Sequence, residues 1–110
     1  MYEYHAELRR VVDGDTLDLL LDLGLHVHVL ARVRLARVDT PEVYGVRHDS
    51  EEYVDGLAAS AFVQGWLAQR DGTLTVRTQK SGKYGRWIAE VADVNGESLN
   101  DALIAEGWTA

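Results

Sequence analysis

Hydrophobic and polar residues alternate along most of the N-terminal third of the chain, a pattern typical of β-strands. The first run of alternation predicts a strand with one solvated face, and its apolar positions are Tyr2, Tyr4, Ala6 and Leu8. A second strand is predicted over residues 17–21, and Leu23-Gly24 indicates a hairpin turn into a third strand over residues 25–38. The length of the third strand predicts a strong bend, with a bulge near Ala36.

The spacing of apolar residues becomes helical after a polar loop at residues 43–55, in which Asp49 and Glu52 are placed to start a short helical turn. A helix is predicted over residues 57–70 and is ended by Asp71-Gly72. Its apolar stripe is formed by Ala58, Phe62 and Trp66, with Leu57 and Ala61 beside it. This stripe is the face on which the helix is expected to pack.

Two more strands and a short helix complete the predicted order. The strands cover residues 74–78 and 86–91, with a basic loop at 79–85 between them and a turn at Asn95-Gly96 after them. Ser98 with Asp101 resembles a capping box for a final helix over residues 99–106, which is stopped by Gly107. Five strands with a helix inserted between the third and the fourth are the order of an OB-fold barrel. We therefore predict a mainly β protein of the α+β class, a five-stranded OB-fold barrel in one domain over residues 1–110.

Composition excludes several classes of site and partner. The chain has no cysteine, which excludes disulfides and thiolate metal sites, and no apolar run approaches the ~18 residues of a membrane span. The formal net charge of −7 disfavours a protein that coats nucleic acid through bulk electrostatics. The N-terminal residues carry no apolar signal core, so we expect either an intracellular protein or a mature secreted form. No membrane contact and no obligate protein partner are indicated.

Three polar turns stand out against the apolar strands. Asp13-Gly14-Asp15-Thr16 separates the first two strands, and Asp39-Thr40-Pro41-Glu42 ends the third, because proline lacks an N–H and fixes φ. Lys83-Tyr84-Gly85-Arg86 opens the fifth. Arg34 lies five residues before Asp39, about 16 Å along an extended chain, so only a curling strand brings both to one pocket. Taken alone, the first turn is more often a plain turn than a site.

Taken in order, these turns resemble the motifs of the staphylococcal (micrococcal) nuclease family, also called thermonucleases. The matching motifs are Val-Asp-Gly-Asp-Thr, Arg-Leu-X-X-Val-Asp-Thr-Pro-Glu, Ala-Ser-Ala-Phe and Lys-Tyr-Gly-Arg, and the resemblance runs from Val11 to Trp108. It implies the same OB-fold barrel. Two departures are visible in the loop after Glu42, which is acidic where the best-known member is rich in lysine, and at Ala110, where the sequence stops before that member's final long helix.

The resemblance implies a calcium site and a catalytic set. Calcium would be held by the carboxylates of Asp15 and Asp39 and by the Thr40 carbonyl, an all-oxygen set that suits this ion. Glu42 matches the family's general base or anchor of the attacking water, and Arg34 and Arg86 match the two arginines that clamp the scissile phosphate. Lys83 and Tyr84 match positions near the bound nucleotide.

Plainer readings are expected for other polar and aromatic residues. The run of Arg77, Lys80, Lys83 and Arg86 is usually a solvated loop, although at this place it borders the expected site and suits steering of a phosphate backbone. His26 and His28 share a face of the predicted strand and are expected to be a solvated edge rather than a zinc site. Trp66, Trp87 and Trp108 are expected in the core or capping the barrel.

The function indicated by this set is calcium-dependent hydrolysis of phosphodiester bonds in DNA and RNA. We expect little sequence preference, a preference for single strands and 3′-phosphate products. The alternative is a non-catalytic OB-fold module that binds nucleic acid or protein, and a third possibility is a domain that works within a larger assembly. Retention of both acids, both arginines and the glutamate favours the enzyme.

Overall fold

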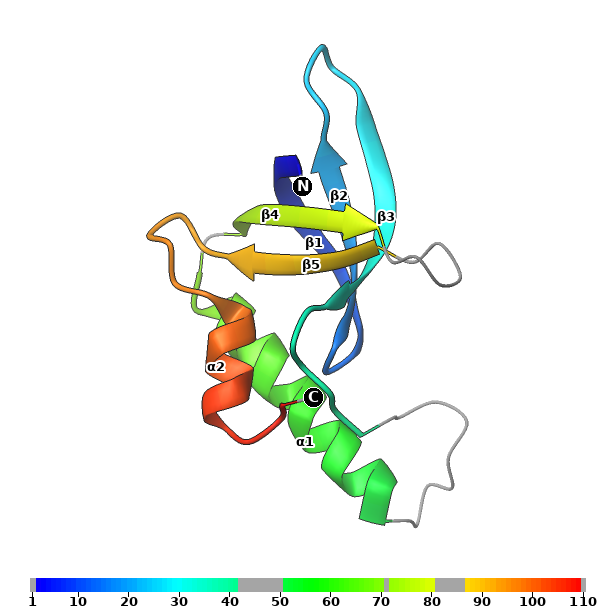
Figure 1. The fold of residues 1–110 in the computed structure, drawn as a ribbon, viewed down its shortest axis with the longest axis vertical. Helices are drawn as coiled ribbons and strands as arrows, with labels where there is room; N and C mark the ends of the chain where they lie inside the picture. Colours follow the sequence, from blue (N-terminus) through cyan, green and yellow to red (C-terminus); the bar gives the residue numbers. More distant parts are fainter. Residues whose placement is uncertain (1, 42–50, 71, 81–86, 110) are drawn as a thin grey trace.

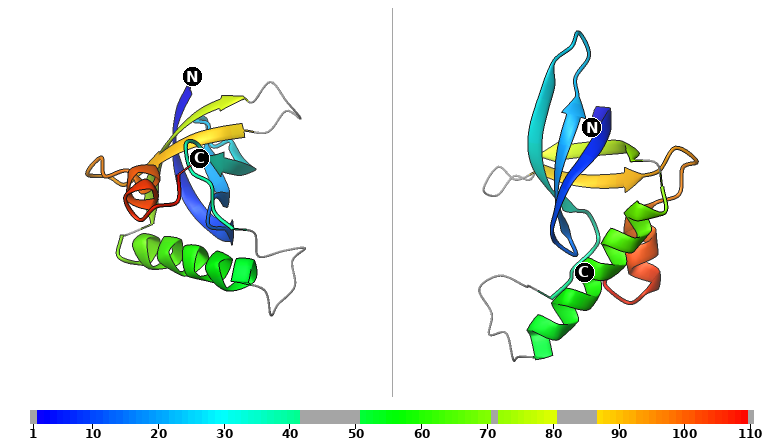
Figure 2. Two further views of the ribbon diagram at one scale, coloured as in Figure 1. Left: turned by 60° about the horizontal axis from the view of Figure 1, so that its bottom comes forward. Right: turned by 180° about the vertical axis from the view of Figure 1, so that it is seen from behind.

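Five strands close into a barrel in the computed structural model, which describes residues 2–41, 51–70, 72–80 and 87–109. The elements follow the chain as β1 (Tyr2–Asp13), β2 (Thr16–Asp22), β3 (His28–Leu35), α1 (Glu51–Ala68), β4 (Thr73–Lys80), β5 (Trp87–Ala92) and α2 (Leu99–Ala105). The strands are hydrogen-bonded in the order β1-β2-β3-β5-β4 and close on β1, as in an OB-fold. Both helices lie at one end of the barrel, and the β2–β3 hairpin projects from the other (Figures 1 and 2).

The long strand β1 belongs to both sides of the barrel. Its first half pairs with β4 from Tyr2 to Glu7, and it pairs with β2 from His5 to Asp13. Two register shifts interrupt the pairing with β2, one between Leu8 and Arg10 and one further on. Bulges of this kind increase local twist and bend, which lets one strand curve around the barrel.

Alternate residues of the strands point into the barrel and form its core. Every second residue of β2 is buried, and the matching residues of β1, β3, β4 and β5 face the same interior. The fully buried residues include Leu17, Leu19, Val33, Leu35, Val76, Val91, Leu99 and Leu103. The two leucines of this set that lie in α2 show that the second helix closes the lower end of the core.

The predicted fold is confirmed, and several boundaries and one helix face differ from the prediction. β3 starts at His28 and ends at Leu35 instead of covering 25–38, and α2 ends at Ala105. α1 begins at Glu51, six residues before the predicted start, because residues 51–55, three of them acidic, form its largely exposed first turns. Its buried residues are Gly56, Ala59, Val63 and Leu67. Of the predicted stripe, Phe62 and Trp66 pack against the core, whereas Ala58 and the flanking Leu57 and Ala61 are exposed. Among the described residues, no helix is long and apolar enough to cross a membrane.

Candidate active site

A cleft of about 920 Å³ lies at the end of the barrel that carries α1. It is bounded by the β1–β2 turn, the segment that follows β3, the first turns of α1 and a residue near the C-terminus. The described residues that line it are Asp13, Asp15, Thr16, Arg34, Asp39, Thr40, Pro41, Glu51, Glu52, Asp55 and Trp108. Four of the residues predicted for the site, Asp15, Arg34, Asp39 and Thr40, therefore share one cleft.

The β1–β2 turn reaches the cleft because Gly14 packs directly against its neighbours. A Cβ at this position would lie 2.7 Å from the Ala59 Cβ of α1 and 3.0 Å from two side-chain atoms of Thr40. Contacts this short do not occur between real side chains, so the close approach needs glycine. The glycine of the Asp13-Gly14-Asp15 motif thus sets the position of the two acids beside it.

Asp15 is buried, and its carboxylate and backbone carbonyl are hydrogen-bonded to neighbouring segments at the cleft end of the barrel. One carboxylate oxygen accepts a hydrogen bond from the Thr16 hydroxyl at 3.0 Å, and the other accepts one from the Thr40 amide at 3.4 Å. Its backbone carbonyl accepts a 2.7 Å bond from the Leu35 amide. These contacts join the start of β2 to the end of β3 and to the segment beyond it.

Arg34 lies between the two acids. Its Nη2 is 3.5 Å from Asp15 Oδ2 and 3.6 Å from Asp39 Oδ1, distances of ion pairs rather than hydrogen bonds. The Arg34 side chain is about one-third exposed and that of Asp39 about two-thirds. The guanidinium is thus held near both carboxylates while part of it faces the cleft.

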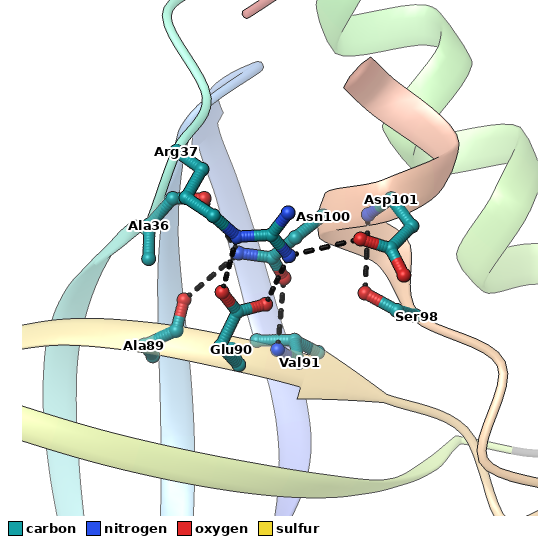
Figure 3. A network of polar contacts seen from close by, with 8 residues as sticks. All are labelled: Ala36, Arg37, Ala89, Glu90, Val91, Ser98, Asn100 and Asp101. Atoms are coloured by element: carbon teal, nitrogen blue, oxygen red, sulfur yellow. Dashed lines mark hydrogen bonds and ion pairs between the residues drawn. The ribbon is translucent and has the colours of Figure 1, made fainter. Parts of the chain in front are cut away.

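A sharp turn after β3 brings Asp39 to Arg34. The residue at this turn, Arg37, has a φ of +65°, which is unfavourable for a side chain of this size. Its guanidinium donates two hydrogen bonds to Glu90 (2.7 and 2.9 Å) and one to Asp101 (2.9 Å), as Figure 3 shows. The hydrogen bonds to Glu90 and then to Asp101 raise the pKa of Arg37 above its usual range. The predicted bulged strand near Ala36 is therefore wrong: β3 ends at Leu35, and the chain changes direction in a turn at Ala36 and Arg37.

The side-chain amide of Asn100, in α2, also holds this turn in place. Its side chain is fully buried and donates to the carbonyls of Ala36 (2.9 Å) and Ala89 (3.0 Å), while its oxygen accepts from the Val91 amide (2.9 Å). Figure 3 shows this amide between the end of β3, strand β5 and α2. The start of α2 is secured by Ser98, whose hydroxyl accepts from the Asp101 amide at 3.1 Å, as the predicted cap requires. Together these bonds define the path that leads to Asp39 and Thr40.

The remaining predicted site residues, Glu42, Lys83, Tyr84 and Arg86, lie outside the described residues. Of the basic run, Arg77 and Lys80 lie in β4, where the Arg77 guanidinium is 4.0 Å from Glu3. His26 lies at the hairpin tip with a φ of +63° and His28 starts β3, and both are exposed, so the expectation of solvated residues holds. Trp66 and Trp108 pack on the core as expected, whereas Trp87 is 41% exposed and was placed wrongly.

Sequence reasoning missed the acidic wall that α1 contributes to the cleft. Glu51 and Asp55 were assigned to a loop and Glu52 only to a short helical turn within it, but all three lie on the first turns of α1 and line the cleft. The signal was present in the sequence, because Ser50 followed by two glutamates is typical of a helix start. Trp108, whose ring contacts Phe62 edge-on at a centroid distance of 5.7 Å, was also missed as a lining residue.

The donor atoms in the cleft have the chemistry of a site for a hard cation. Carboxylate and threonine oxygens are the available ligands, and buried Thr40 Oγ1 has no hydrogen-bond partner among the described residues. Within that part of the chain, no three carboxylate or imidazole groups lie close enough to hold a metal by themselves. The residues therefore fit an ion that takes two carboxylates and fills its remaining positions with carbonyl oxygens and water, as calcium does.

Comparison with known proteins agrees with the fold and with the motifs. The sequence model of the staphylococcal nuclease homologues matches residues 32–110. The chain is 31% identical over 110 residues to endonuclease YhcR of Bacillus subtilis, and 25% identical over 105 residues to an uncharacterized endonuclease of Escherichia coli O157:H7. Each match covers 96% of this chain but only 9% of the first relative and 59% of the second. The match to most of the chain, together with the closed five-stranded barrel, shows that this protein belongs to the staphylococcal nuclease homologue family.

Proposed function

We propose that this protein is a calcium-dependent nuclease that hydrolyses phosphodiester bonds in DNA and RNA with little sequence preference. The observation that carries the proposal is the approach of Asp15 and Asp39, from two separate turns, to one nitrogen of Arg34. Membership of the nuclease family and the names of the two endonuclease relatives support it.

The charge of the cleft explains why a cation is needed. Its described lining contains six carboxylates and one arginine, so it repels a phosphate unless positive charge is added. Asp15, Asp39 and the Thr40 carbonyl would hold the ion. When bound, calcium would supply a positive charge beside the phosphate and weaken the hold of the two acids on Arg34.

Arg34 would stabilise the negative charge that develops on the phosphate. Attack on phosphorus builds negative charge on the equatorial oxygens, and the planar guanidinium can donate to two of these oxygens at once. The acids already place this guanidinium at the cleft before substrate arrives, so little reorganisation is required.

The proposal assigns the other roles by motif position. Arg86 is the second clamp on the phosphate, Glu42 is the base or the anchor of the attacking water, and Lys83 and Tyr84 contact the nucleotide. Water attacks in line, the 5′ oxygen leaves and the product carries a 3′-phosphate. Single strands are favoured, because a phosphate splayed from the duplex reaches a cleft with acidic walls more easily.

Digestion of heat-denatured DNA tests the proposal. Wild-type protein is expected to cleave with calcium and to stop when excess chelator is added. Asp39→Ala should be inactive, whereas the control Glu7→Ala, an exposed acid of β1 outside the cleft, should retain wild-type rates. Cleavage that persists in chelator would refute calcium dependence. A folded wild-type protein that binds DNA in calcium without cleaving it would instead establish the non-catalytic OB-fold module.

A further inference from the structure

The β2–β3 hairpin extends beyond the barrel, and the charged residues of the chain are missing from its outer part. Figure 1 shows its tip well above β4 and β5. Residues 23–31 contain no aspartate, glutamate, lysine or arginine, although the whole chain has 29 such residues and a net charge of −7. A solvated hairpin of a monomer normally carries polar residues at its tip, so this segment needs another explanation.

The inner face of the hairpin is apolar and half exposed. Leu21 lies opposite Val29 in the β2–β3 pairing, and the Leu23 amide bonds to the Val27 carbonyl at 2.9 Å, so these four residues share one face. Tyr2 and Tyr4 of β1, whose rings stack at 6.5 Å, and Trp87 of β5 border it. We call this surface the hairpin cup: Tyr2, Tyr4, Leu21, Leu23, Val27, Val29, Ala31 and Trp87. A cavity of about 160 Å³ lies in its floor.

Leu25 at the tip of the hairpin is an apolar residue that stands in solvent. Its side chain is 96% exposed. Its φ is +53°, and its neighbours Gly24 and His26 also have positive φ, at +81° and +63°. The left-handed conformation is unfavourable for a leucine. Within one molecule, therefore, the residue adds both backbone strain and exposed apolar surface.

We propose that the hairpin cup binds a second copy of this chain, in a twofold symmetric dimer in which Leu25 of each copy enters the cup of the other. Face-to-face antiparallel hairpins place the tip of one over the base of its partner, where the cavity lies. The arrangement is isologous, so it closes at two copies instead of growing into a fibre. It gives Leu25 the apolar contacts that the single chain lacks.

The size of the exposed surface agrees with a dimer. Exposed fractions are 70% for Tyr2, 50% for Val27, 44% for Leu23, 42% for Val29 and 41% for Trp87. With Leu25, these side chains expose on the order of 600 Å² per copy, and two such surfaces reach the roughly 1,200 Å² at which stable interfaces begin. Charge favours the same surface, because two acidic molecules repel elsewhere but can meet at an uncharged hairpin.

Sedimentation equilibrium of the whole chain, from about 1 to about 200 µM, tests the dimer. Wild-type protein is expected to show a monomer–dimer equilibrium. Leu25→Asp should raise the dissociation constant by roughly 100-fold or more, since the symmetric interface loses the leucine twice. The control Val94→Asp, which adds the same charge at a 63% exposed valine in the turn after β5, should leave it unchanged.

Leu25→Gly separates assembly from folding. Glycine adopts positive φ without strain, so this variant should melt no lower than wild type and still fail to dimerise. A wild-type chain that stays monomeric throughout, or a dimer that survives both Leu25 substitutions, would overturn the proposal. A monomer that binds neutral phosphatidylcholine vesicles through Leu25 would also overturn it and assign the cup to a membrane surface. Because the cup and the cleft are lined by different residues, these outcomes are independent of nuclease activity.

Discussion

Two arginines on β3 show how the partners of a side chain decide its use. Arg32 donates two hydrogen bonds to Asp18, at 2.8 and 3.1 Å, and lies outside the cleft. The pKa of Asp18 is lowered, chiefly by these hydrogen bonds, so Asp18 already serves as the hydrogen-bonding partner of Arg32. Arg34, two residues on, faces two carboxylates at 3.5 and 3.6 Å and makes no hydrogen bond with either. With respect to the described residues, Arg34 therefore keeps hydrogen-bond donors that can bind a phosphate.

Substituting Arg34→Lys should lower kcat on single-stranded DNA by about 10²–10³-fold, because an ammonium cannot donate to two phosphate oxygens in the fork geometry. KM should change less. Arg32→Lys, on the same strand, should stay within about threefold of wild type, since it only exchanges an exposed ion pair. Steady-state cleavage rates measured in calcium test this prediction. Equal losses of kcat in both variants would show that Arg34 does not bind the phosphate.

Asp93 gives the protein a pH dependence that lies far from the cleft. Burial opposes its ionisation, but hydrogen bonds from Arg70 (2.8 Å) and from the Glu97 and Asn95 amides outweigh it and lower its pKa. A lowered pKa in the folded state contributes stability that is present above the unfolded value near 4 and is lost as pH falls through the folded value. Wild-type stability should therefore fall more steeply below about pH 4 than that of Asp93→Asn. Urea denaturation at a series of acid pH values measures this, and parallel curves would contradict it.

At the scale of elements, the strands and the acid-bearing turns could be predicted because their cause is local. Alternation over residues 17–21 specifies the buried face of β2. Pro41 was expected to end the next strand, but β3 already ends at Leu35, before the turn at Ala36 and Arg37. The predicted face of α1 was only partly right, because small residues contribute to the buried face. Gly56 and Ala59 are buried by tertiary packing, which hydrophobicity does not reveal. The acidic wall was missed for a related reason, since its residues were assigned to a loop.

Asn100 also escaped prediction, because nothing local distinguishes a buried asparagine from one on a solvated helix. Its replacement by leucine removes the hydrogen bonds of Asn100 to the Ala36 carbonyl and the Val91 amide, at a cost of about 2–4 kcal/mol, whereas the Ala89 carbonyl keeps its bond from the Ala36 amide. Asn95→Ala, in the exposed turn before α2, should cost less than about 1 kcal/mol. Chemical denaturation of both variants is the measurement. Because Asn100 holds the turn that leads to Asp39, cleavage by the leucine variant should also fall, and wild-type activity in it would show that the turn holds without this anchor.

For the whole molecule, the proposed calcium site predicts a linked gain in stability. Binding to the folded state alone contributes ~2.7 kcal/mol at a hundredfold excess of ion over Kd, which raises the melting temperature of a domain of this size by about 5–15 °C. A nucleoside diphosphate should raise it further only when calcium is present, because its phosphates would meet Arg34 beside the ion. Thermal melts of wild type, Asp39→Ala and Glu7→Ala separate the site from the general acidic surface. An equal shift in all three would refute the assignment.

The parallel pairing of Val33–Leu35 with Trp87–Ala89 joins segments separated by about half the chain. Strands β1, β2 and β3 form a local meander that can assemble early, whereas closing a loop of this length is slow. Asp15 and Arg34 belong to the meander, whereas Asp39 follows the turn that Asn100 links to Ala89 of β5, so its position depends on the closed barrel. We therefore expect cleavage activity to return only with the last kinetic phase of refolding. A collapsed chain whose barrel has not closed would contain the residues of both acidic turns but would not cleave nucleic acid.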